Sequence, residues 1–182
     1  MSEPESSDRR EWVLAALDRY EARLARYAAR LLGDEEAARD VVQHAFLRLC
    51  DQSPAELEGR LAPWLFTVCR NRAVDILRAR KRTASLEQVH DLPHRNHQPD
   101  PAVTVERQDL YRRLNDLVAE LPSSQREAVD LWTEGFAHAE IARITGHSEG
   151  NVRVLVHRAL KTLRRHPLAR QLVEQPIETK KA

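Results

Sequence analysis

The 182-residue sequence is long enough for one domain or two small ones, and its 42% hydrophobic and 31% charged residues are typical of a soluble globular protein. No apolar run approaches the ~20 residues of a membrane span, and the acid-bearing first ten residues lack the apolar stretch of a signal peptide, so we expect a cytoplasmic protein. The net charge of +1 conceals two basic segments, 64–82 and 151–165, with an acidic one between them, which favours two contacts with one polyanion.

The first fifty residues predict two helices. Only five glycines, and apolar residues at spacings of three and four, favour an all-α fold. We expect the first helix over 12–32, where the apolar pattern continues until Gly33 stops it. A second helix is expected to follow over 34–49, with Asp34 as its N-cap.

The two cysteines and the loop between the second and third helices carry little functional signal. Cys50 and Cys69 lie on apolar helical faces without metal-site spacing, so we expect reduced core residues rather than a disulfide or a metal clamp. Residues 50–63 contain three Pro or Gly residues, which predict a loop with one helical turn at Ala55–Leu57.

Residues 64–82 are the most informative stretch. Their apolar residues recur at helical spacing and can be buried, whereas a polar stripe lines another face. That stripe consists of Asn71, Asp75, Arg78 and Arg82. Six basic residues against one acid suit a contact with nucleic acid. On composition alone, a solvated helix whose C-terminal basic residues complement the helix dipole is an equal alternative.

The order of residues in 64–82 is similar to that of a known family. The stretch contains Trp-Leu-aromatic, then Arg-Asn, and then Asp-x-x-Arg with trailing basic residues. This order resembles the promoter-reading helix of bacterial sigma factors of the extracytoplasmic-function group. The resemblance implies that this helix and the preceding loop read the −10 element and hold it open. The implied DNA-binding residues are Trp64, Asn71, Arg72, Asp75, Arg78, Lys81 and Arg82. Trp64 is either a stacking platform for a base or a core residue, and we favour the core.

The second expected helix contains a further segment of resemblance. Residues 38–47 resemble the family's polymerase-docking helix, which implies that Asp40, Gln43, Phe46 and Leu47 contact a coiled coil in the largest subunit of core RNA polymerase. Asp40 and Gln43 are one turn apart, and Phe46 and Leu47 would supply apolar contact. The alternative is an ordinary amphipathic helix. Arg39 and His44 stand where acids are common in the family, which could alter the charge match.

Residues 83–104 read as a flexible linker. They contain three prolines, three histidines and little apolar periodicity. The spacing of His90, His94 and His97 raises a metal-site hypothesis, but no cysteine is near and we favour solvated histidines. We therefore expect no cofactor.

The apolar helical pattern resumes at Val105 and leads into a helix-turn-helix. Pro122 should stop one helix, and Ser123 or Ser124 should cap the next, with Ser124 and Glu127 spaced as a capping box. Within 136–165, Gly146 is expected to close a short helix, and Ser148, two residues later, to cap the second one.

The outward face of that second helix is expected to meet the major groove. The implied contacts are Glu149, Asn151, Arg153, Val154, His157, Arg158 and Lys161. Five short motifs in this part of the chain together resemble the sigma family's domain for the −35 element. They are Leu-Pro, Gln-Arg-Glu, Glu-Ile-Ala, Gly-x-Ser and Arg-Ala-x-x-x-Leu-Arg. Ala137 departs from the usual capping Ser and would leave Glu140 without its partner. Asn151 and Val154 replace a common Thr and Ser, which favours a shifted sequence preference.

The sequence thus predicts two small helical domains: 10–82 for polymerase and the −10 element, and 105–166 for the −35 element, with 167–182 a tail of unknown role. The resemblance implies a sigma factor, not an enzyme, with core RNA polymerase and promoter DNA as partners and an anti-sigma factor as a further candidate. One alternative is a helix-turn-helix regulator that binds duplex operators without polymerase. Another is a metal- or redox-responsive interaction protein.

Overall fold

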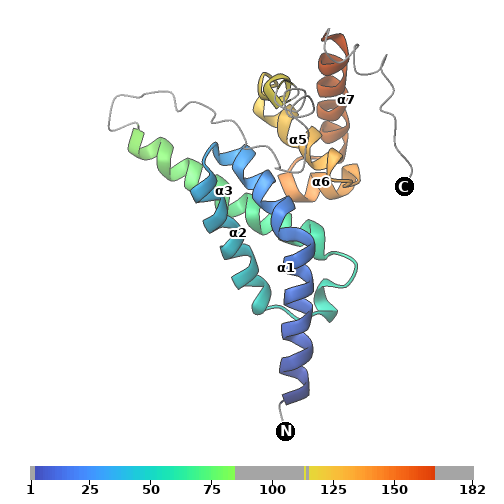
Figure 1. Cartoon of the computed structure of the whole chain (residues 1–182). Helices are drawn as coiled ribbons and strands as arrows, with labels where there is room; N and C mark the ends of the chain where they lie inside the picture. Colours follow the sequence, from blue (N-terminus) through green and yellow to red (C-terminus); the bar gives the residue numbers. More distant parts are fainter. Residues whose placement is uncertain (1–2, 85–112, 114, 167–182) are drawn as a thin grey trace, which may run out of the picture.

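The structure, a computed structural model, describes residues 3–84, 113 and 115–166. These residues form helices, turns and loops without any strand, which confirms the all-α prediction (Figure 1). In chain order the elements are α1 (Glu3–Leu32), α2 (Glu35–Cys50), the 3-10 turn η1 (Ala55–Leu57), α3 (Leu61–Ala84), α5 (Ser123–Thr133), α6 (His138–Thr145) and α7 (Glu149–Arg165). Residues 115–119, ahead of α5, are also helical. The expected linker lies largely outside the described residues.

Helix α1 begins earlier than the sequence pattern suggests. The apolar periodicity starts at Trp12, but the helix starts at Glu3, and its N-terminal turns project beyond the other helices (Figure 1). These turns contain almost no apolar residue, so periodicity could not reveal them. The next boundary is as predicted, because the Asp34 carboxylate accepts hydrogen bonds from the backbone N–H groups of Glu36 and Ala37 at 3.0 and 3.1 Å.

The third helix also begins before its expected start. The turn Ala55–Leu57 forms as predicted, and α3 then starts at Leu61 rather than at residue 64. Pro63 therefore lies in the first helical turn, where the missing N–H is not needed.

The two cysteines differ in burial. Cys69 is buried as expected, but Cys50 is exposed, so the core prediction for Cys50 was wrong. Cys50 is the last residue of α2, where the preceding Leu49 takes the buried position and the chain turns away.

The helix-turn-helix has the predicted turn. Gly146 adopts a φ of 74° at the end of α6, a conformation that glycine tolerates without strain. The Ser148 side chain accepts a hydrogen bond from the Asn151 N–H at 3.3 Å and caps α7. Two other expectations were wrong. The N-cap of α5 is Pro122 instead of a serine, and it makes no side-chain hydrogen bond. The Glu140 carboxylate does find a partner, because it accepts a hydrogen bond from the backbone N–H of Ala137 at 2.8 Å.

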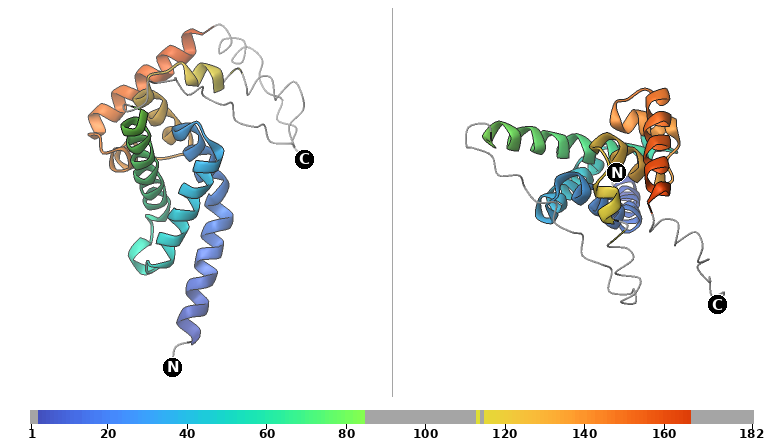
Figure 2. Two further views of the ribbon diagram at one scale, coloured as in Figure 1. Left: turned by 90° about the vertical axis from the view of Figure 1, so that its left-hand side faces the viewer. Right: turned by 90° about the horizontal axis from the view of Figure 1, so that it is seen from above.

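The two groups of helices pack against each other. Helix α6 contacts α3, and buried apolar residues from both groups form one continuous cluster. At its centre, the rings of Phe66 in α3 and Phe136 before α6 meet edge to face, with centroids 4.9 Å apart. Seen from above, α3 extends to one side of the molecule and α7 stands on the other (Figure 2).

Candidate promoter and polymerase interfaces

Helix α3 presents the predicted polar stripe to solvent. Its exposed members are Asn71, Arg72, Asp75, Arg78, Lys81 and Arg82. Asp75 and Arg78 approach to 3.8 Å, but both side chains are largely exposed, so this pair leaves the arginine available to another anion. Trp64 is half-buried and packs against the core, as we favoured from the sequence.

One member of the basic run at the end of α3 has a structural partner. Arg80 donates to the Asp34 carboxylate at 2.6 Å, so it ties α3 to the start of α2. The Ala37 N–H, and then Arg80, lower the pKa of Asp34 below its ordinary value, because both stabilise the carboxylate. Composition could not separate Arg80 from Arg78 and Lys81, because only packing gives it this neighbour.

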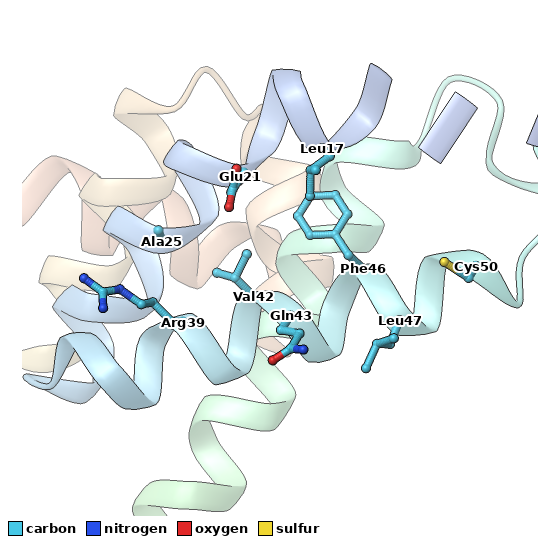
Figure 3. Close-up of a pocket in the computed structure, with 9 residues that line it drawn as sticks. All are labelled: Leu17, Glu21, Ala25, Arg39, Val42, Gln43, Phe46, Leu47 and Cys50. Atoms are coloured by element: carbon cyan, nitrogen blue, oxygen red, sulfur yellow. The ribbon is translucent and has the colours of Figure 1, made fainter. Parts of the chain in front are cut away.

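The proposed docking residues on α2 divide into an exposed and a buried part. Asp40, Gln43 and Leu47 are exposed, and the Leu47 side chain points away from α1 (Figure 3). Phe46 is only 7% exposed, and its ring points toward Leu17 of α1. It therefore contributes mainly to packing between α1 and α2, and Leu47 is the larger apolar contact available to a partner.

A cavity of about 410 Å³ lies beside these residues. It opens between α1 and α2, and both Gln43 and Leu47 line it (Figure 3). Its walls are mainly apolar. The predicted docking residues Gln43 and Leu47 thus border a mainly apolar cavity.

The outward face of α7 carries every residue that the sequence selected for it. Glu149, Asn151, Arg153, Val154, His157, Arg158 and Lys161 are all exposed. The opposite face is buried against α5 and α6. Arg153 pairs with Glu149 at 3.0 Å, one turn away, and both side chains remain more than half exposed. The helix therefore offers polar, cationic and apolar groups to a groove.

The chemistry of the described residues gives little support to a metal or redox role. Among them, no group of His, Cys, Asp and Glu could hold a metal ion, and the three linker histidines lie outside the described part. Burial raises the pKa of Cys69 to about 12, so its thiol stays protonated and unreactive.

No helix among the described residues is long and apolar enough to cross a membrane.

Comparison with known proteins agrees with this arrangement. Residues 16–83 match Sigma-70 region 2, and residues 111–163 match Sigma-70, region 4. The chain is 33% identical over 156 residues to the ECF RNA polymerase sigma factor SigL of Mycobacterium tuberculosis, covering 82% of this chain and 85% of SigL. It is 34% identical over 135 residues to the sigma factor RpoE of Cereibacter sphaeroides, covering 72% and 71% of the two chains.

A solved structure resembles most of the chain. The sigma factor RpoE of Bartonella quintana, in complex with the anti-sigma factor NepR, superposes with a TM-score of 0.71 at 25% identity. The match covers 90% of this chain and 97% of that one, so it includes both groups of helices. The operator-binding alternative accounts for only the second of the two matched regions. This chain belongs to the extracytoplasmic-function sigma factors, which bind core RNA polymerase and direct promoter-specific transcription.

Proposed function

We propose a division of labour among three helices: α2 docks on core RNA polymerase, α3 reads the −10 element, and α7 reads the −35 element as duplex. The observation that carries this proposal is the exposure of three separate polar faces, one on each helix, in a chain that matches both sigma regions. The proposal includes the division of the chain into a first domain over 10–82, a linker over 83–104 and a second domain over 105–166.

The roles of individual side chains follow from their chemistry. On α7, Asn151 is suited to adenine, Arg153 to guanine and the Val154 side chain to a thymine methyl group. Val154 is 44% exposed, so its methyl groups are accessible to a base. The Glu149 partner of Arg153 is exposed, so the guanidinium can exchange it for a base edge.

The energetics of DNA opening favour a dependence on polymerase. Each stacked step of duplex costs about 1.4 kcal/mol to open. The chain has nine aromatic residues, of which at least Tyr20, Tyr27, Phe46, Phe66 and Phe136 are buried and cannot stack on bases. We therefore propose that the chain alone neither melts DNA nor catalyses a reaction, and that it acts in the cytoplasm with polymerase. An anti-sigma factor is a candidate partner, because the matched RpoE structure contains one.

The test of the proposed function is run-off transcription with core polymerase, with and without this chain.

Asp40→Ala combined with Gln43→Ala should weaken co-purification with core by about tenfold or more, because both exposed groups would lose their partners. Glu120→Ala, at an exposed carboxylate near the start of α5, is the matched control. Undiminished core binding by the folded double variant would remove the docking assignment.

A further inference from the structure

One glycine of this chain is not required by its fold. Four of the five glycines adopt φ values of 65–92°, a conformation in which other residues are strained. The fifth, Gly150, has no positive φ and is the second residue of α7. Beyond its own helical turn, a Cβ atom added to Gly150 would meet no atom of the described residues within 4 Å. Neither backbone conformation nor packing therefore explains a glycine at this position.

A glycine in α7 has a cost for folding. Glycine loses more backbone entropy than any other residue when it enters a helix, and it is among the poorest helix formers. At a helical position with free space, alanine stabilises a protein because it restricts the unfolded chain. The folded chain by itself would thus gain from a side chain at Gly150. The remaining use of a glycine is to let a ligand approach the backbone closely.

Gly150 lies at the centre of the outward face of α7. Three exposed residues follow it at spacings of four, three and four, so they share its helix face. They are Val154, His157 and Lys161. The buried residues of α7 lie on the opposite face, which packs against α5 and α6. A surface that meets the outward face of α7 would therefore come closest to the helix backbone at Gly150.

The side chains along this line become longer toward the C-terminal end of the helix. Gly150 has no side chain, Val154 has a short one, and those of His157 and Lys161 are progressively longer. A surface in contact with all four residues therefore lies nearest to the helix axis at the N-terminal end. This taper suits a helix whose first turn enters the major groove and whose later turns reach phosphates.

The candidate base-reading residues surround Gly150. Asn151 is next to it in the chain, and Arg153 lies one turn on, where its side chain bonds to Glu149 at 3.0 Å. Val154 follows Gly150 at a spacing of four. These four neighbours are all exposed, and each can reach a base edge only as deeply as the backbone beside Gly150 permits. The depth of the first turn thus controls several contacts at once.

Given the proposed reading of the −35 element by α7, on which this step rests, we infer that Gly150 is a positioning residue for promoter recognition. The missing side chain lets the α7 backbone contact base edges at the floor of the major groove. A side chain at this position would hold the helix away from the groove floor. Asn151, Arg153 and Val154 would then withdraw together, whereas the long side chain of Lys161 would still reach a phosphate. Gly150 thereby contributes to sequence specificity without reading a base itself.

The first test measures stability and promoter binding of two variants in the full chain. Gly150→Ala should raise the melting temperature by about 1–4 °C, because alanine favours the helix. It should nevertheless weaken promoter binding with core polymerase in a competition gel shift. Gly150→Leu should weaken this binding by about tenfold or more, the loss expected when at least one base contact is withdrawn. Because leucine is also a better helix former than glycine, a folding defect would not account for the loss.

The matched control is Ser123→Leu, which adds bulk in the first turn of α5, at an exposed position outside α7. It should bind the promoter as the parent does. Parent-like promoter affinity of Gly150→Leu would overturn the inference. A melting temperature of Gly150→Ala several degrees below that of the parent would also overturn it, because the fold itself would then require the glycine.

A second test distinguishes positioning by Gly150 from base reading. Each base pair of the −35 element is changed in turn, and binding by the parent and the variants is compared in the presence of core polymerase. Gly150→Leu should lose discrimination at several base pairs together, whereas Asn151→Ala should alter it at one. Loss at a single base pair in Gly150→Leu would show that the positioning role is wrong. A parent chain that binds equally with and without the −35 sequence would instead remove the proposed reading by α7.

Discussion

The carboxylate of Asp130 illustrates how burial changes the effect of a single charge. Loss of water raises its pKa, and Arg30 compensates only in part. In the range between the ordinary aspartate pKa and the raised one, the folded protein binds more protons than the unfolded chain. Stability from this group therefore falls as the pH rises through that range, and the full cost is present at neutral pH.

Asp130→Asn should consequently not lower the melting temperature at pH 7, and should raise it if the amide oxygen still accepts from Arg30. The difference between variant and parent should shrink at about pH 4 or below, where the aspartate becomes protonated in both states. Thermal unfolding followed by circular dichroism at both pH values measures this. A melting temperature several degrees lower at pH 7 would show that the Arg30 pair outweighs desolvation.

At the scale of an element, α3 combines two kinds of arginine. Arg78 and Arg82 are exposed on the polar stripe, whereas Arg80 bonds to Asp34 of the neighbouring helix boundary. The first kind is available to DNA and the second stabilises the bundle. Substitutions of different arginines in α3 can therefore test DNA contact and folding stability separately.

Replacing Asn71, Arg78 and Arg82 together by alanine should impair promoter opening more than core binding, because each loses a contact to the −10 region. Permanganate reactivity of thymines in the −10 region should fall by about tenfold or more, given ~1 kcal/mol or more per charged contact. Arg80→Ala is the matched control and should lower thermal stability while leaving opening by folded protein intact. Parent-like reactivity in the triple variant would remove the −10 assignment.

At the scale of the whole molecule, we expect two weak DNA contacts that become specific only when polymerase holds them at a set separation. The free chain should bind duplex DNA weakly and with a strong salt dependence. Four basic residues of α7 would supply roughly three or four phosphate contacts, and each contact adds about 0.9 to the slope of log affinity against log salt concentration. These residues are Arg158, Lys161, Arg164 and Arg165.

A gel-shift titration at two salt concentrations, with and without core polymerase, checks this expectation. Arg158→Ala should weaken binding across promoters, because phosphates carry no sequence information. Asn151→Ala should instead change which −35 sequence is preferred, with a loss of about 1–3 kcal/mol at one base pair. Tight, sequence-specific binding by the chain alone would contradict the dependence on polymerase.

Local features of this molecule could be predicted from the sequence. Asp34, Gly146 and Ser148 act through backbone groups within four residues, so their roles as caps depend on little else. The exposed stripes of α3 and α7 follow from helical periodicity, since residues that recur every three or four positions share a face. The order of motifs along these stripes was sufficient to identify the family.

Contacts between distant residues could be decided only by the tertiary structure. Glu127 has the spacing of a capping-box residue, but its carboxylate pairs with Arg70, 57 residues away, and Arg23 reaches Glu134 across 111 residues. Phe46 is buried by α1, and Cys50 is exposed where α2 ends. Sequence spacing describes one helix at a time, whereas these outcomes depend on which faces of different helices meet. That is why the sequence identified the exposed faces of α3 and α7, and only the packing showed which residues of the two groups of helices meet.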